Sequence, residues 1–389
     1  MAVQILADGL ELRTGRRARA LAQMEAFDLD VLVLGRQANV RYVTGAPQLW
    51  VAGTRPFAPI CVMMRGTGEI HLNSSWDEGM PEEIDHDHLY GLAWNPMTLV
   101  DVLKNIDGAA GARRVGTDAM SPTFAQLLPI AFPKAELVDG ELAMRTARRI
   151  KTPEEVVALR GATRVAEHGL AAALSELAPG ITEQSLTGAM LEAMAAGGVS
   201  TSATQDGAWV TSGEHPWRQG PRDRRVADGD LVAFASGALA DGYVGEVGRT
   251  VAVGDVPGAN ELFGRSTALW DKLFASCRPG ASASDLLAAY EAAGEPLPAT
   301  PVAHGLGLGF DTPVVSPDLP QTSAEERLDP GTVVAVTGYV WALGVGAVYQ
   351  RDAVLITEDG AEVLTTNRSH DERSREEHAR GRQAPVGTH

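Results

Sequence analysis

The chain has 389 residues, which is long for one hydrophobic core, so its length predicts two domains. Apolar residues make up 44% of it and charged residues 21%, a composition typical of folded domains and not of general disorder. A net charge of -17 disfavours binding to polyphosphate backbones, so we expect small molecules as partners and no nucleic acid.

The apolar runs and the cysteines point to one compartment. No apolar run approaches the roughly 18 to 20 residues that a membrane-spanning helix requires, so no membrane partner is expected. The first residues lack a basic segment followed by an apolar core, which argues against a secretory signal. Cys61 and Cys277 lie in no CxxC motif and are too few for a disulfide framework. Together these features predict a cytoplasmic protein with reduced thiols.

The first half of the chain opens with a helix and a strand. Apolar residues at Ala18, Leu21 and Met24 predict an amphipathic helix over residues 10–27, and a buried strand follows at residues 31–35. Further strands are predicted at residues 59–64, 69–72 and 114–116, separated by polar and glycine-bearing turns. These elements predict an α/β domain over residues 1–145.

A helix-start signal opens the second domain. Thr152 as N-cap, Pro153 at the first helical position and Glu155 three residues after the cap form a capping box. Strand groups then alternate with helix pairs without regular βαβ alternation, which favours an α+β arrangement over residues 146–368. The helices are predicted at residues 183–196 and between 260 and 293, and the strands at 207–211, 231–235, 249–253, 332–336 and 353–357. Residues 369–389 are polar and aperiodic, so they are expected to form a disordered tail.

Four segments of the second half resemble the creatinase/aminopeptidase P family, whose catalytic domain has the pita-bread fold. In this chain they read GDLV at residues 229–232, DGYVGEVGRT at 241–250, HGLG at 304–307 and LITEDG at 355–360. The linker IKTPEE at residues 150–155 is similar to the family's inter-domain helix start, and the first half fits the creatinase-type N-terminal domain more loosely. The resemblance implies a smaller α/β N-terminal domain, a C-terminal pita-bread domain and a homodimer.

The resemblance also implies a missing metal site. In the family's peptidases, two divalent cations are held by two aspartates, a histidine and two glutamates. Carried over position by position, these ligands fall on Ala235, Glu246, His304, Thr337 and Arg351. Two usable ligands beside an arginine cannot hold a pair of cations at useful affinity. We therefore expect no metal and no other cofactor.

Arginine takes a central place in the altered site. The two further histidines that shuttle protons in the peptidases fall on Arg218 and Asp311. A permanently charged guanidinium at a carboxylate position suggests that Arg351 replaces the charge of the metal and pairs with Glu246. Arg218 could then clamp a substrate carboxylate through two hydrogen bonds. The substrate-binding residues expected in this domain are Arg218, Arg351, Thr337 and Tyr339.

Creatinase is the family's precedent for chemistry without metal. It hydrolyses a C–N bond with a histidine and acidic residues, and it binds its substrate carboxylate through arginines. Its catalytic histidine position falls on Arg218 here, with His215 three residues away. The expected acid/base groups are His304, Glu246, Asp311 and His215. A couple between His304 and Asp311 would orient the imidazole and raise its basicity.

Trp50, Arg55 and Phe57 look similar to a loop that reaches the partner's active site in creatinase-like dimers. There they would form a lid that recognises an anionic or aromatic substrate. Each feature also has a plainer interpretation. These three side chains can serve core or dimer packing, His304 can be a structural histidine, and Glu246 with Arg351 can be a buried salt bridge.

The sequence leaves several functions open. The first hypothesis is a metal-independent, creatinase-like enzyme that hydrolyses a C–N bond of a small carboxylate-bearing molecule. A lyase or isomerase that applies general-base chemistry to the substrate is an alternative on the same scaffold. A catalytically inactive binding protein and a peptidase with a single metal ion are the other two.

Overall fold

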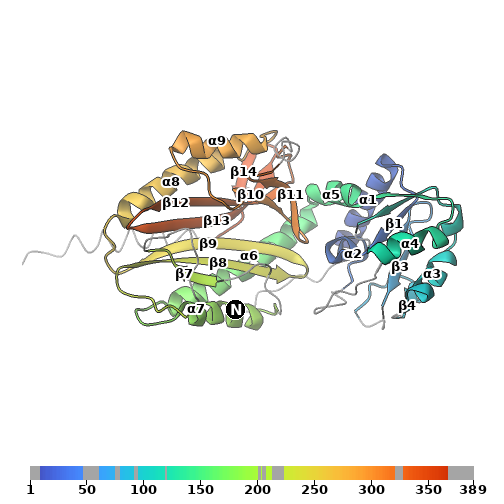
Figure 1. The fold of residues 1–389 in the computed structure, drawn as a ribbon, viewed down its shortest axis with the longest axis horizontal. Helices are drawn as coiled ribbons and strands as arrows, with labels where there is room; N and C mark the ends of the chain where they lie inside the picture. Colours follow the sequence, from blue (N-terminus) through green and yellow to red (C-terminus); the bar gives the residue numbers. More distant parts are fainter. Residues whose placement is uncertain are drawn as a thin grey trace, which may run out of the picture.

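The computed structural model describes residues 9–46, 61–74, 79–91, 95–118, 121–199, 203, 207–212, 223–319 and 327–366. Figure 1 shows two lobes, an N-terminal one in blue to teal and a larger C-terminal one in green to red. Helices α5 (Glu141–Arg149) and α6 (Pro153–Ser175) follow one another where the lobes meet (Figure 1). The α+β architecture predicted from the sequence is confirmed.

The N-terminal lobe is built around strand β1 (Val31–Leu34), which is buried along its whole length. Alternate side chains of a strand point to opposite faces of the sheet. Accordingly, Val31 and Val33 enter one apolar cluster, and Leu32 and Leu34 enter another. Helices therefore cover both faces of this sheet.

In the part of the N-terminal lobe that the structure describes, the strands pair in the order β4-β3-β2-β1-β5-β6. Strand β1 pairs antiparallel with β2 and parallel with β5. The remaining strands are β2 (Cys61–Met64), β3 (Ile70–Asn73), β4 (Leu89–Tyr90), β5 (Arg114–Thr117) and β6 (Glu136–Asp139). The helices are α1 (Leu10–Ala26), α2 (Gln37–Thr44), α3 (Pro96–Lys104), α4 (Pro122–Ala131) and the 3₁₀ turns η1 (His86–His88) and η2 (Ala109–Gly111).

The C-terminal lobe holds a larger sheet between two pairs of helices. Its described strands follow the order β11-β10-β12-β13-β9-β8-β7, and β14 pairs with β13. They are β7 (Gly207–Val210), β8 (Asp230–Ala240), β9 (Tyr243–Val253), β10 (Ala303–Leu306), β11 (Phe310–Val315), β12 (Val333–Ala342), β13 (Gly346–Thr357) and β14 (Gly360–Val363). The helices are α6, α7 (Glu183–Ala196), α8 (Ala259–Ser276) and α9 (Ala283–Ala293).

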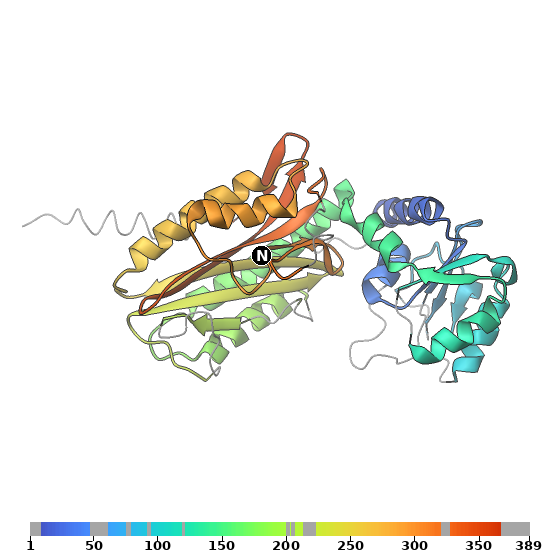
Figure 2. The same ribbon diagram turned by 45° about the horizontal axis from the view of Figure 1, so that its top comes forward.

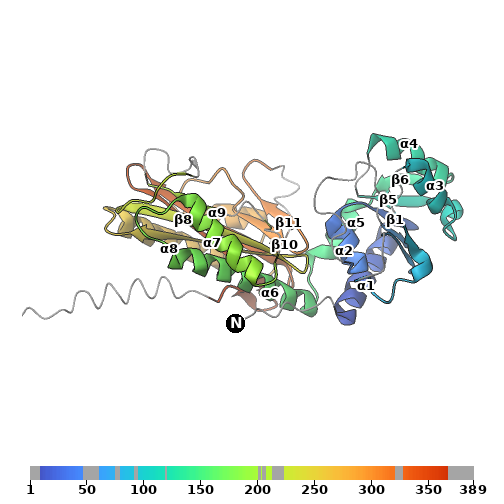
Figure 3. The ribbon, with the colours of Figure 1, turned by 90° about the horizontal axis from the view of Figure 1, so that it is seen from below.

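The helices lie on two sides of this sheet. Helix α6 packs against β8 and β9, and α8 packs against β12 and β13. In Figure 2 the long strands run between the two helix layers, and Figure 3 shows α6 and α7 lying along the underside of β8. Among the described helices, none is both long and apolar enough to cross a membrane.

The start of α6 confirms the predicted capping box. The Thr152 hydroxyl accepts a hydrogen bond from the Glu155 N–H at 3.2 Å, and the Glu155 carboxylate accepts one from the Thr152 N–H at 3.0 Å. This reciprocal pair satisfies two backbone donors that a helix start would otherwise leave unpaired. It fixes the direction in which the chain enters the C-terminal lobe.

The two central hairpins are longer than predicted. Strands β8 and β9 each span 11 residues and are joined by Asp241 and Gly242, which both have positive φ angles, of 48° and 83°. Two such residues form the hairpin turn whose twist matches that of the flanking strands. The extra length of β8 lies at residues 236–240, where Ser, Gly, Ala, Leu and Ala have little intrinsic β propensity and gave no signal.

Candidate functional site

One face of the C-terminal sheet gathers the residues of the site. Ala235, Gly248, Arg351 and Thr337 are partners in a single row that crosses strands β8, β9, β13 and β12. Glu246 lies two residues from Gly248 on β9, so its side chain points to the same face. The register thus brings together side chains far apart in the sequence.

His304 reaches this face from the neighbouring strand. It lies on β10 opposite Ala335, which is two residues from Thr337 on β12. Its side chain is buried, with 5% of the residue exposed. Four of the five positions assigned to metal ligands in the resemblance therefore carry polar side chains that converge here: Glu246, His304, Thr337 and Arg351.

Glu246 is the centre of the contacts. It is only 1% exposed, its Oε1 lies 3.2 Å from His304 Nε2, and its Oε2 accepts a hydrogen bond from Arg351 Nη1 at 2.7 Å. Arg351 Nε donates a second hydrogen bond, to Thr337 Oγ1 at 2.9 Å. The predicted pairing of Arg351 with Glu246 is confirmed as a contact.

The surroundings keep Glu246 ionised. Burial raises the pKa of its carboxyl group, but the hydrogen bond and charge of His304 and the charge and hydrogen bond of Arg351 outweigh that effect, so the pKa lies below its ordinary value of 4.5. An ionised carboxylate can only accept hydrogen bonds. His304 must therefore carry a proton on Nε2 in this contact.

The residues at this face do not fit a pair of divalent cations. Ala235 offers a methyl group, and the Thr337 hydroxyl accepts a hydrogen bond from the Arg351 guanidinium. That guanidinium is itself bonded to Glu246, so a cation stands beside the carboxylate that would ligate a metal. Among the residues that the structure describes, no group of three or more His, Cys, Asp or Glu side chains could hold a metal ion.

The expected couple between His304 and Asp311 needs correction. Asp311 Oδ1 accepts a hydrogen bond from Arg148 Nε at 3.0 Å, and Oδ2 accepts one from Lys151 Nζ at 3.3 Å. The carboxylate lies against the backbone of Gly307, where a Cβ atom would overlap it. Both of its oxygens are thus bonded to cations from elsewhere, so the predicted couple with His304 is wrong, and an acid/base role of Asp311 stays a prediction.

Aromatic side chains line the site next to Arg351. The Arg351 guanidinium carbon lies 5.4 Å from the centre of the Tyr349 ring, which in turn lies 5.4 Å from the Trp209 ring and 6.4 Å from the Tyr339 ring. Burial raises the pKa of both Tyr339 and Tyr349 to about 12, so both phenols are neutral. Tyr339 was predicted. Trp209 and Tyr349 were missed, although Tyr349 lies two residues from Arg351 and therefore shares its face.

Several predicted site residues lie outside the described residues. They are Trp50, Arg55, Phe57, His215 and Arg218. The same holds for the predicted tail at residues 369–389. His86 and His88 form the 3₁₀ turn η1, where the centre of the His88 ring lies 4.2 Å from that of His71.

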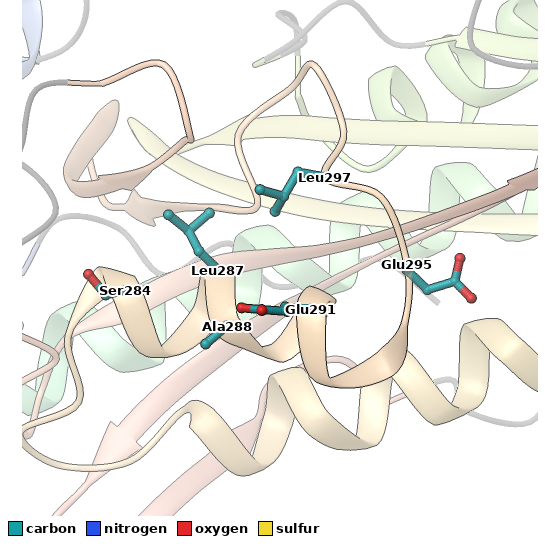
Figure 4. Close-up of a pocket in the computed structure, with 6 residues that line it drawn as sticks. All are labelled: Ser284, Leu287, Ala288, Glu291, Glu295 and Leu297. Atoms are coloured by element: carbon teal, nitrogen blue, oxygen red, sulfur yellow. The ribbon is translucent and has the colours of Figure 1, made fainter.

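A surface hollow of about 510 Å³ lies elsewhere on the C-terminal lobe (Figure 4). Helix α9 and the segment after it form its walls, where Leu287 and Leu297 border the same space. Glu295 at its rim is held by two hydrogen bonds from Arg265. The hollow shares no residue with the His304 site and has no cluster of reactive groups, so it is not the candidate site.

Comparison with sequence families gives two matches. Residues 157–358 match the model of metallopeptidase family M24, and residues 16–150 match that of the creatinase/prolidase N-terminal domain. Among curated proteins, an uncharacterised hydrolase/peptidase of Sinorhizobium fredii is 26% identical over 306 residues, which cover 71% of this chain and 74% of that protein. A putative dipeptidase of Bacillus subtilis is 25% identical over 306 residues, which cover 75% of this chain and 80% of that protein. An uncharacterised peptidase of Staphylococcus aureus is 25% identical, and the match spans only 65% of its length.

Solved structures share the fold. The prolidase from Pyrococcus horikoshii superposes with a TM-score of 0.72 at 20% identity, covering 90% of this chain and 98% of the prolidase. The Xaa-Pro dipeptidase from Bacillus anthracis gives 0.74 at 19% identity, with 91% and 98% covered. At such low identity the likeness extends to the fold alone.

Proposed function

This chain belongs to metallopeptidase family M24, and from that membership we propose that it is a hydrolase that works without metal on a C–N bond of a small carboxylate-bearing molecule, in the manner of creatinase. One observation carries the proposal. Arg351, at a position that ligates metal in the family's peptidases, donates hydrogen bonds to Glu246 and Thr337, which stand at two others. The positive charge of the site thus comes from a side chain.

Arg351 is suited to binding the substrate carboxylate. Its Nη1 and Nε atoms are engaged, but Nη2 makes no hydrogen bond with any described residue, and 16% of the side chain is exposed. A guanidinium held by two hydrogen bonds is already oriented, so little side-chain entropy is lost when it binds a carboxylate oxygen. The neighbouring aromatic rings would exclude water from that contact.

His304 is the proton-transfer group under this proposal. Hydrolysis adds a water oxygen to carbon, breaks the C–N bond and requires a proton on the leaving nitrogen. An imidazole oriented by a carboxylate can move protons at neutral pH. Glu246 provides that carboxylate, because it holds His304 on one oxygen and Arg351 on the other.

One observation favours a second candidate, a binding protein without catalytic activity. Both oxygens of Glu246 are engaged by His304 and Arg351, and those of Asp311 by Arg148 and Lys151. In the described part of the site, these two carboxylates are therefore both committed to ion pairs. A binding protein needs no free general base. Hydrolysis needs one to activate water, and it would have to be His304 or a residue other than these two carboxylates.

The deciding experiment combines a binding screen with an assay. Purified protein is treated with a chelator, its metal content is checked by elemental analysis, and amidino, lactam and amino-acid-like carboxylates are screened by thermal shift. Every stabilising compound is then tested for release of ammonia or an amine. Turnover in the chelated protein supports the proposal, stabilisation without turnover supports the binding protein, and turnover only after a divalent metal is added overturns both.

A further inference from the structure

The junction of the two lobes contains a buried ion cluster beside the candidate site. Asp311 on β11 is 3% exposed, and each of its carboxylate oxygens accepts a hydrogen bond from a cation. Arg148 comes from α5, at the end of the N-terminal lobe, and Lys151 comes from the linker before α6. Their side chains are 6% and 0% exposed, so solvent does not screen the cluster.

The cluster extends into the N-terminal lobe. Arg148 Nη2 lies 3.3 Å from Glu141 Oε1, and the Asn39 amide donates to the other oxygen of Glu141 at 2.7 Å. Asn39 also donates to Asp118, which receives the backbone N–H of Gly35 at the end of β1. A continuous chain of hydrogen bonds therefore joins the sheet of the first lobe to β11 of the second.

Strand β11 is irregular at the point where it passes His304. His304 pairs with Val314, but the next residue, Gly305, pairs with Asp311, so Thr312 and Pro313 have no partner on β10. This is a β-bulge, a device that redirects a side chain beside a site. Asp311 is the first paired residue beyond the bulge on the side of Gly305.

Gly307 leaves room for the Asp311 carboxylate. A Cβ atom there would overlap the Asp311 carboxylate and would lie 3.4 Å from Lys151 Cε. The carboxylate therefore occupies the space of a missing side chain and is pressed between β10 and the linker. The HGLG segment that identified the family is thus required here for close approach of β11.

The cluster is expensive to bury and is not fully satisfied. Moving charged groups out of water costs several kcal/mol for each ion, which their attraction offsets only with good geometry. Arg148 Nη1 is buried and has no hydrogen-bond partner among the described residues. An apolar joint would avoid these costs, so stability alone does not account for the cluster.

We propose that Asp311, clamped by Arg148 and Lys151, is a positioning residue: it fixes the bulge in β11 and thereby holds the His304 imidazole against Glu246. The orientation of the N-terminal lobe then sets the geometry of the site in the C-terminal lobe. The relevance of this positioning to catalysis rests on the proposed function, in which His304 transfers the proton. The geometric effect on His304 is independent of the reaction.

The test observes His304 directly, without a substrate. In protein labelled with nitrogen-15 histidine, the Nε2–H of His304 bonded to Glu246 should give a signal protected from exchange, assigned by its absence in His304→Gln. Asp311→Asn should abolish that signal. The matched control is Asp329→Asn, because Asp329 pairs with Arg149 of the same helix at 2.8 Å but is 40% exposed. The control should leave the signal unchanged.

A second pair of variants separates positioning from general loss of structure. Arg148→Gln removes one of the two cations and should abolish the His304 signal, and Arg148→Lys, which keeps the charge, should restore it at least in part. This pair also replaces Asp311→Asn if that variant does not fold. Retention of the signal in folded Asp311→Asn or Arg148→Gln protein overturns the inference. If the His304 signal responds to the variants as expected but no carboxylate compound is turned over, the inference stands and the proposed function is refuted.

Discussion

Arg351 and Glu246 are 105 residues apart in the sequence, yet Arg351 Nη1 lies 2.7 Å from Glu246 Oε2 in a part of the sheet that is almost closed to solvent. If either side chain is removed, the other stays charged in a mostly buried place with only one side-chain hydrogen bond left, from His304 to Glu246 or from Arg351 to Thr337. The pair joins two of the positions that the resemblance assigns to metal ligands.

Arg351→Ala should lower the free energy of unfolding by about 3–5 kcal/mol, because it leaves the Glu246 charge buried without its closest partner. Arg160→Ala serves as the control, since Arg160 forms an ion pair of equal length with Glu362 at side-chain exposures of 32% and 48%. Exposed pairs contribute about 0–1 kcal/mol. Urea unfolding at neutral pH measures both variants, and equal losses would contradict a buried ion pair at position 351.

The pH dependence of stability should include a contribution from Glu246. Its pKa is lower in the folded state than its ordinary value of 4.5, so the folded protein holds the ionised form more strongly than the unfolded chain does. The resulting stability is present above pH 4.5 and is lost as the pH falls through the folded pKa. Glu246→Gln should therefore lose less stability than the wild type as the pH falls below 4.5. Parallel unfolding curves for the two proteins over this range would rule out the assignment.

Restoring the carboxylates should restore metal binding. The triple variant Ala235→Asp, Thr337→Glu, Arg351→Glu places three carboxylates beside Glu246 and His304 and removes the competing guanidinium. Oxygen ligands and one imidazole suit divalent cations. After dialysis against manganese, the folded variant should retain metal by elemental analysis and the wild type should not. Equal metal content in both proteins would show that the ligand set does not control occupancy.

Gly307→Ala should destabilise the protein by about 1–3 kcal/mol, the usual range for overpacking, because the Asp311 carboxylate occupies the space of the new methyl group. Gly161→Ala is the control. Gly161 lies inside α6 with no atom near the position of a Cβ, so alanine there should stabilise by about 0.5–1 kcal/mol. Thermal unfolding measures the change in stability of both variants. No change in Gly307→Ala would show that the Asp311 carboxylate can move without cost.

Local signals made much of the fold predictable. The capping box at Thr152 and Glu155 is visible in four letters, and α7 begins and ends where its residues predict, at Glu183 and Ala196. Strands β10 and β11 were missed because their pairing depends on a shift in register that no local pattern encodes. Helix α5 carries arginines that the sequence alone could not place in a buried cluster.

The candidate site was predictable as far as the resemblance reached. Arg351 and Glu246 were paired correctly because both fall on positions that meet in the family. The partner of Asp311 was predicted wrongly, since Arg148 and Lys151 come from the other lobe and the linker, and long-range ion pairs leave no trace in the spacing of residues. Tyr349 and Trp209 were missed because aromatic residues in strands are usually assigned to the core.

The linker between the lobes has a consequence for exchanging parts between relatives. The Lys151 N–H donates a hydrogen bond to the Gly331 carbonyl at 2.9 Å, and its side chain donates one to Asp311. This residue therefore contacts the second lobe through both its backbone and its side chain. A chimera with the C-terminal half of a relative that has no aspartate at position 311 would bring Arg148 and Lys151 without their acceptor. The two halves therefore depend on each other through this cluster. An exchange of halves between family members would have to transfer position 311 together with Arg148 and Lys151.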